Sequence, residues 1–153
     1  MMQYKKKKFI SGFTLLELMI VLITLSILAT VITLSFSKLG TDQSLDKATI
    51  TIISVLNEAK SNAVSSKYAT SFGVRIDKNK ITSFRGSYNN SNVDYTLSGL
   101  VTISTSTGIG NDIIFQNVSG NTNASGTITV SLVSDPTKKT VIQVFGTGAI
   151  QKN

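Results

Sequence analysis

The hydrophobic pattern first singles out one long apolar run. From Phe13 to Phe36 the chain has 17 apolar residues in 24, no glycine or proline, and one charged residue, Glu17. About 20 such residues in a helix cross the hydrocarbon core of a bilayer, so residues 13–36 are predicted to form a transmembrane helix. The run is longer than the apolar region of a secretory signal and lacks a good small-residue cleavage site, so we reject that alternative.

A second pattern follows between residues 44 and 66. Its apolar residues recur at spacings of three and four, with three more that widen the face: Leu45, Ala48, Ile52, Leu56, Ala59 and Ala63, then Ile53, Val55 and Val64. This periodicity predicts an amphipathic helix over 44–66, continuous or nearly so with the apolar run. Gly40 is a possible end or bend between the two segments, and Thr41 or Asp42 would cap a restart.

After residue 67 the pattern changes to the alternation of strands, clearest in Phe72, Val74 and Ile76. Further strands are predicted at 81–88, 94–105 (with a bulge or break at Gly99), 113–118, 127–133, 140–145 and 149–151. One helix followed by six or seven antiparallel strands gives the α+β class. We therefore predict a long N-terminal helix packed on a C-terminal antiparallel β-sheet, with a soluble domain over 37–153 and its sheet over 68–151.

Charge is concentrated at the N-terminal end. Lys5–Lys8 precede the apolar run, and positive flanks remain on the cytoplasmic side of a membrane, so residues after Ser37 are predicted to lie outside. The chain has 15 basic and 8 acidic residues. Four of the basic residues are these lysines, and the remainder of the chain is close to neutral. That removes most of the compositional argument for nucleic-acid binding.

The chain contains no cysteine and no histidine, which excludes the usual zinc sites and the Ser-His-Asp and Cys-His nucleophile systems. The carboxylates outside the apolar run lie mostly beside turn-forming residues and are better explained as turn and cap residues than as a catalytic pair. No calcium-binding loop sequence is present. We expect no catalytic, cofactor-binding or metal-binding residue, and the protein is not expected to be an enzyme.

The start of the apolar run carries a specific motif. Lys5–Lys8 are followed by Gly12-Phe13-Thr14-Leu15-Leu16-Glu17-Leu18 and a uniform apolar helix. This resembles the class III signal of type IV prepilins and pseudopilins. The resemblance implies that residues 1–12 are a leader, that prepilin peptidase cuts between Gly12 and Phe13, and that Phe13 is then N-methylated. Glu17 would be the assembly residue that meets the Phe13 ammonium of a neighbouring subunit. From the residues alone, an ordinary anchor that tolerates one glutamate is the alternative.

The same resemblance implies a location and partners. The protein would be a single-pass protein of the bacterial cytoplasmic membrane with a cytoplasmic N-terminus, and later a part of a pilus or pseudopilus. Its partners would be prepilin peptidase, other pilin or pseudopilin subunits and the inner-membrane assembly platform. The segments of the second half that resemble minor pseudopilins of the type II secretion H type and related minor pilins are 57–63, 73–76, 114–116, 127–130, 141–145 and 148–150. Lys60 and Lys67 depart from the arginines frequent in relatives.

A few basic residues are candidates for ligand contact. Lys138, Lys139 and Lys152 lie near the C-terminal end, and Arg75 and Arg85 lie on strands predicted to pair. The simpler interpretation of the lysines is a solvated hairpin turn. The functional one is phosphate contact with DNA, which would make the protein a tip module for DNA uptake or surface adhesion rather than only a filament subunit. The sequence does not say whether a secretion, pilus or competence system is served.

Overall fold

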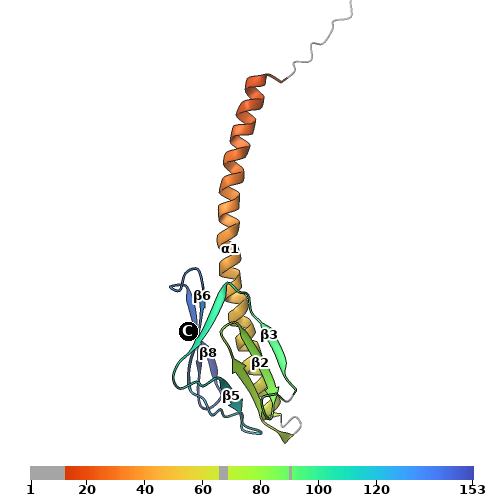
Figure 1. The fold of residues 1–153 in the computed structure, drawn as a ribbon, viewed down its shortest axis with the longest axis vertical. Coiled ribbons are helices and arrows are strands. Elements are labelled where there is room, and N and C mark those ends of the chain that lie inside the picture. Colours follow the sequence, from red (N-terminus) through yellow and green to blue (C-terminus); the bar gives the residue numbers. More distant parts are fainter. Residues whose placement is uncertain (1–12, 66–68, 90) are drawn as a thin grey trace, which may run out of the picture. The chain divides into compact units, whose positions relative to one another are not determined.

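The structure, a computed structural model, describes residues 13–65, 69–89 and 91–153, and of residues 33–39 it describes the backbone alone. Its helix α1 runs from Leu15 to Val64 (Figure 1). The backbone remains helical through Gly40, so no second helix starts at Thr41 or Asp42 and the prediction of continuity is confirmed. Lys5–Lys8 and Gly12 lie outside the described residues, as does Ser66 at the predicted helix end. The described residues divide into two units, those up to Leu39 and those from Gly40 to Asn153, which are described separately below.

The strands of the second unit form two antiparallel sheets. The described residues contain eight strands: β1 (Phe72–Ile76), β2 (Lys80–Arg85), β3 (Val93–Thr96), β4 (Val101–Thr105), β5 (Asp112–Phe115), β6 (Gly126–Leu132), β7 (Lys139–Val144) and β8 (Ile150–Lys152). Sheet A has the order β3-β2-β1-β5 and sheet B the order β4-β6-β7-β8. The α+β class with a helix on antiparallel sheet is therefore confirmed.

The sequence did not predict the division into two sheets. Residues 94–105 were predicted as one strand with a break at Gly99, but β3 belongs to sheet A and β4 to sheet B, so this break is the point where the chain changes sheets. The predicted strands 81–88 and 113–118 also extended too far, since β2 ends at Arg85 and β5 at Phe115. In β1 the alternation was correct, because Phe72, Val74 and Ile76 are all buried.

The core lies between the C-terminal half of α1 and both sheets. The helical face predicted from periodicity is confirmed at its centre, where Ile52 and Leu56 are completely buried. Burying one such side chain contributes about 1.5–3 kcal/mol. Val64 was predicted on the same face but is 45% exposed. Thr49 is instead fully buried, and its hydroxyl donates to the Leu45 carbonyl (2.8 Å), which satisfies the polar group.

Backbone hydrogen bonds connect the two sheets and the end of the helix. The amide of Ile103 in β4 donates to the carbonyl of Lys78 in the β1–β2 turn (2.8 Å), which ties sheet B to sheet A. The amide of Val118 donates to the Ala63 carbonyl in the last turn of α1 (3.0 Å). This bond satisfies one of the carbonyls that every helix end leaves without an intrahelical partner.

A fragment that starts at Gly40 is expected to fold without the apolar run. Among the residues whose burial the structure describes, the buried core runs from Ala48 to Val144, so the fragment retains this core. Its circular dichroism spectrum should combine helix and strand signals, and thermal unfolding should be cooperative. A disordered spectrum for the Gly40 fragment in dilute buffer would contradict this prediction.

Candidate functional site

The apolar run is exposed over its whole described surface. Leu15–Ile32 is long and apolar enough to cross a membrane, with a mean hydropathy of 2.6, and none of it is buried within the protein. Within this segment Glu17 is the one charged residue. An all-round apolar helix of this kind is stable only where lipid or other helices cover it. The segment is therefore compatible with membrane anchoring.

The first turn of α1 holds Glu17 by a local motif that the sequence analysis did not identify. The hydroxyl of Thr14 accepts a hydrogen bond from the Glu17 amide (3.2 Å), and the Thr14 carbonyl accepts one from the Leu18 amide (3.2 Å). Thr14 is thus the N-cap, and Glu17 lies three residues later, the spacing of a capping box. A carboxylate in the first turn also interacts favourably with the helix dipole. The pattern Thr-x-x-Glu before an apolar run was the signal that would have found this cap.

Hydroxyls in the apolar run bond back to the helix. Thr24 donates to the carbonyl of Val21 (2.9 Å), Ser26 to that of Leu22 (2.8 Å), and Thr30 to that of Ser26 (2.9 Å). Because these groups are satisfied within the helix, they carry little cost in a lipid environment. Phe13, just before the helix, is 83% exposed. Gly12, the other residue of the predicted cleavage site, lies outside the described residues.

Arg75 is held on the outer face of sheet A, the face away from α1. Its guanidinium makes two hydrogen bonds of 2.6 Å to the carboxylate of Asp112 on the adjacent strand β5. It also lies 3.5 Å from the ring centroid of Tyr88, and this ring meets Phe84 edge-on with centroids 5.8 Å apart. The bonds to Asp112 raise the pKa of Arg75 above its already high value. Through its bidentate bonds and its stacking, Arg75 fixes the pairing of β1 with β5 and the position of Tyr88.

Arg85 lies on the opposite face from Arg75, although both strands pair as predicted. Arg75 stands opposite Thr82, whereas Arg85 stands opposite Phe72, whose side chain is in the core. Side chains alternate between the two faces of a sheet, so these arginines cannot form one patch. Arg85 donates a hydrogen bond to the Ser91 hydroxyl (3.3 Å).

The C-terminal lysines contact acidic residues of α1. Lys138 Nζ lies 2.7 Å from Asp42 Oδ1, and Lys152 Nζ lies 3.9 Å from Asp46 Oδ1. The hydrogen bond to Asp42 raises the pKa of Lys138. Lys139 begins β7 and is exposed. The five basic residues proposed from sequence are thus distributed over different surfaces, and two of the three lysines neutralise helix carboxylates.

The remaining carboxylates have structural roles. Asp94 accepts a hydrogen bond from the buried Thr82 hydroxyl (2.7 Å), which lowers the pKa of Asp94 together with the neighbouring Lys80. Asp135 accepts bonds from the amide and hydroxyl of Thr137, and these lower the pKa of Asp135. In the described part of the chain, no three His, Cys, Asp or Glu residues lie close enough together to hold a metal ion.

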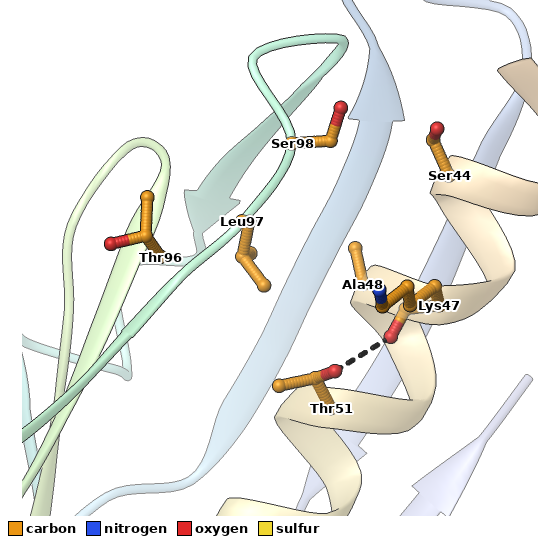
Figure 2. Close-up of a pocket in the computed structure, with 7 residues that line it drawn as sticks. All are labelled: Ser44, Lys47, Ala48, Thr51, Thr96, Leu97 and Ser98. Atoms are coloured by element: carbon orange, nitrogen blue, oxygen red, sulfur yellow. Dashed lines mark hydrogen bonds between the residues drawn. The ribbon is translucent and has the colours of Figure 1, made fainter.

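One cavity of about 360 Å³ lies between α1 and the segment after β3 (Figure 2). Its lining residues are Ser44, Lys47, Ala48, Thr51, Thr96, Leu97 and Ser98. Leu97 and Ala48 are its apolar lining residues and lie on its two walls, and the hydroxyl of Thr51 donates a hydrogen bond to the Lys47 carbonyl (2.8 Å). Lys47 is the single ionisable residue among those that line the cavity. The cavity has no local sequence signal, because its two walls are about fifty residues apart in the chain.

Comparisons with known proteins agree on the fold. No protein-family profile and no curated protein sequence match the chain. Among solved structures, the minor pseudopilin EpsH from the type 2 secretion system of Vibrio cholerae aligns with a TM-score of 0.59 and 15% identity, over 72% of this chain and 96% of that one. The type IV minor pilin FimU of Pseudomonas aeruginosa aligns with a TM-score of 0.60 and 15% identity, over 72% and 89%. The chain therefore has a fold like that of minor pilins and pseudopilins.

Proposed function

We propose that the protein is a structural subunit of a type IV pilus or type II secretion pseudopilus, of the minor type. The observation that carries this proposal is the combination of a pilin-like fold with an exposed apolar helix that has one acidic residue in its first turn. Such a helix needs a bilayer before assembly and the helices of neighbouring subunits afterwards. The subunit would act by packing of these N-terminal helices.

The proposal includes the processing that the N-terminal motif implies. Prepilin peptidase would cut on the cytoplasmic side between Gly12 and Phe13 and methylate the new Phe13 amino group, and the domain after Ser37 would lie outside the cytoplasmic membrane. The ammonium at Phe13 would then pair with Glu17 of an adjacent subunit. The inner-membrane assembly platform and other pilin-like subunits would be its partners. The pairing of two desolvated charges is better suited to setting axial register than to adding much stability.

A substitution at the cleavage site tests this processing. Gly12→Leu is expected to leave the precursor uncut but still inserted, since the apolar run that drives insertion is unchanged. Intact-mass measurement of membrane-extracted protein should find a methylated Phe13 terminus in the natural sequence and the full leader in the variant. A Met1 terminus on the natural protein, in cells with an active prepilin peptidase, would contradict the proposal.

DNA uptake or surface adhesion at a filament tip is the second candidate, and the charges favour it less. Arg75 and Lys138 would have to exchange Asp112 and Asp42 for phosphates, and Arg85 lies on another face. Phosphate contacts give a steep dependence of affinity on salt. DNA binding by the Gly40 fragment with such a dependence would favour the tip module, and its absence would favour the purely structural subunit.

A further inference from the structure

Both sheets end in a strand whose outer backbone groups point away from the sheet. In β3, the Leu97 amide bonds to the Asn79 carbonyl, and the alternation of an antiparallel ladder then directs the N–H and C=O of Asp94 and Thr96 outward. In β8, the Asn153 amide bonds to the Val141 carbonyl. The same alternation then directs the N–H and C=O groups of Ile150 and Lys152 outward. Within the described residues no further strand pairs with either edge. Such an edge is a template for strand addition.

The two edges lie on opposite sides of α1 (Figure 1). The segment after β3 shares a cavity with Ser44, Lys47 and Thr51, whereas β8 is connected to α1 by the contact between Lys152 and Asp46. At 3.6 residues per turn, Lys47 and Asp46 differ by about 100°, and Thr51 and Asp46 by about 140°. Between the two edges the helix presents an exposed strip that includes Ile50, Ser54, Asn57 and Ser61.

Both edge strands run in the same direction along α1. In the first, β1 starts beside Phe115, whose following loop bonds to Ala63 at the end of α1, so β1 leaves that end, β2 returns to it and β3 leaves it again toward the cavity that Ser98 shares with Ser44. Glu58 lies about 20° around the helix from Lys47, on the β3 side of α1, and its carboxylate adds to the effect of burial in raising the pKa of Tyr95. In the second, a Cβ at Gly148 would lie 3.5 Å from Lys60 Cε, and Lys152 is then beside Asp46. Each strand therefore proceeds toward the Gly40 end of the helix. In two copies with the same orientation, β3 of one and β8 of the other are parallel.

We propose that β8 of a second copy adds to β3 of the first copy as a parallel strand, which lines up successive domains side by side. The inference rests on the proposed function, because the common orientation comes from insertion in one membrane. Asp94 faces away from the core on sheet A, and Gln151 does so on sheet B. Residues side by side in a parallel pair share a face, so this pairing keeps the helices of both copies on one side. The contact joins two different edges, so it can repeat from copy to copy, and it gives an open filament when the rotation between copies does not close a ring.

Charge selects the register of this pairing. Two registers are possible, and each forms three backbone hydrogen bonds. In the first register Asp94 lies beside Gln151 of the second copy, and in the second register Thr96 lies beside Gln151. The first register brings Lys152 of the second copy beside Tyr95, near Glu58; the second brings it beside Leu97, near Lys47. In the described part of the chain, Glu58 has no basic residue and Lys47 no acidic residue within ion-pair distance. The first register is therefore favoured, and it places Thr96 beside Asn153 of the second copy.

Cysteine crosslinking in membranes tests the pairing, because the natural chain has no cysteine. Two full-length copies with different epitope tags, one carrying Thr96→Cys and the other Asn153→Cys, are co-expressed and oxidised. We expect a disulfide between the two tags, and several-fold less of it when Gln151→Cys replaces Asn153→Cys. Equal or stronger linkage with Gln151→Cys would overturn the register, and no linkage with either would overturn the pairing.

Exchanging the charges of Glu58 and Lys152 distinguishes loss of their ion pair from loss of folding. Glu58→Lys or Lys152→Glu should each lower the crosslink yield roughly two- to fivefold, as expected for an exposed ion pair, and the double variant should restore it. Asp46→Asn, which removes the carboxylate that competes for Lys152 within its own chain, should leave the yield unchanged or raise it. A double variant no better than the single ones would contradict the Glu58–Lys152 pairing.

The variant Ile27→Cys tests the proposed assembly through α1 separately from the pairing of the sheet edges. It reports contact between apolar helices and does not depend on the sheet edges. Linkage through Ile27→Cys without linkage between Thr96→Cys and Asn153→Cys would remove the edge pairing and leave the assembly through α1 intact. Absence of linkage at both places would contradict both.

Discussion

Gly148→Ala is expected to lower the stability of the second unit more than any surface substitution. Gly148 has φ = +72°, a backbone conformation that costs an L-residue about 1–2 kcal/mol. A Cβ added there would also collide with the carbonyl oxygen of Gly120, a backbone atom that cannot rotate away. Overpacking of this kind typically costs a further 1–3 kcal/mol. We therefore expect a loss of about 2–5 kcal/mol, visible as a lower midpoint of thermal unfolding of the Gly40 fragment.

Gly146→Ala is the matched control in the same β7–β8 turn. A Cβ at Gly146 meets no atom within 4 Å, and Gly146 is not among the glycines with positive φ. Its midpoint should stay close to that of the natural sequence, or rise slightly because alanine restricts the unfolded chain. Equal effects of the two substitutions would contradict the backbone and steric restriction at Gly148.

Local periodicity accounts for the parts of the fold that were predicted. The buried face of α1 and the alternation of Phe72, Val74 and Ile76 follow from rules that act over a few residues. The two-sheet arrangement was missed because β3 and β4 look like one interrupted strand, and their partners β2 and β6 are distant in sequence. Val64 was misplaced for a related reason, since the end of α1 is packed by the 116–120 loop and not by a strand face.

The contacts of the candidate binding residues also depend on residues that are distant in the sequence. The bond between Lys138 and Asp42 joins residues 96 positions apart, and Arg75 meets Asp112 through the register of β1 with β5. Neither pairing has a local sequence signal. The opposite facing of Arg75 and Arg85 depends on register as well, because a shift of one residue would move an arginine to the other face. The N-terminal motif is different, since the Thr14 cap and the position of Glu17 are set within one helical turn.

Glu17→Val is expected to abolish or strongly reduce incorporation into filaments, while cleavage, methylation and membrane insertion continue. Removing a charged residue from the apolar run makes insertion easier. In the proposed assembly, however, the Phe13 ammonium of an adjacent subunit would lose its partner, and one buried charge without its mate costs about 3–5 kcal/mol relative to the intact pair. The variant should be found in the membrane fraction with a methylated Phe13 terminus, and should be missing from sheared filaments or crosslinked tip complexes.

Two further variants distinguish the charge of Glu17 from its place in the first turn of α1. Glu17→Gln retains the side-chain length without the charge, so it should fail in assembly as Glu17→Val does. Thr14→Ala removes the N-cap that bonds to the Glu17 amide but leaves the carboxylate, and it should assemble with at most a modest loss, since a cap contributes about 1 kcal/mol. If Glu17→Gln assembled normally and Thr14→Ala did not, the first turn of the helix would be the feature that matters, and Glu17 would act through the helix end instead of through a neighbouring ammonium.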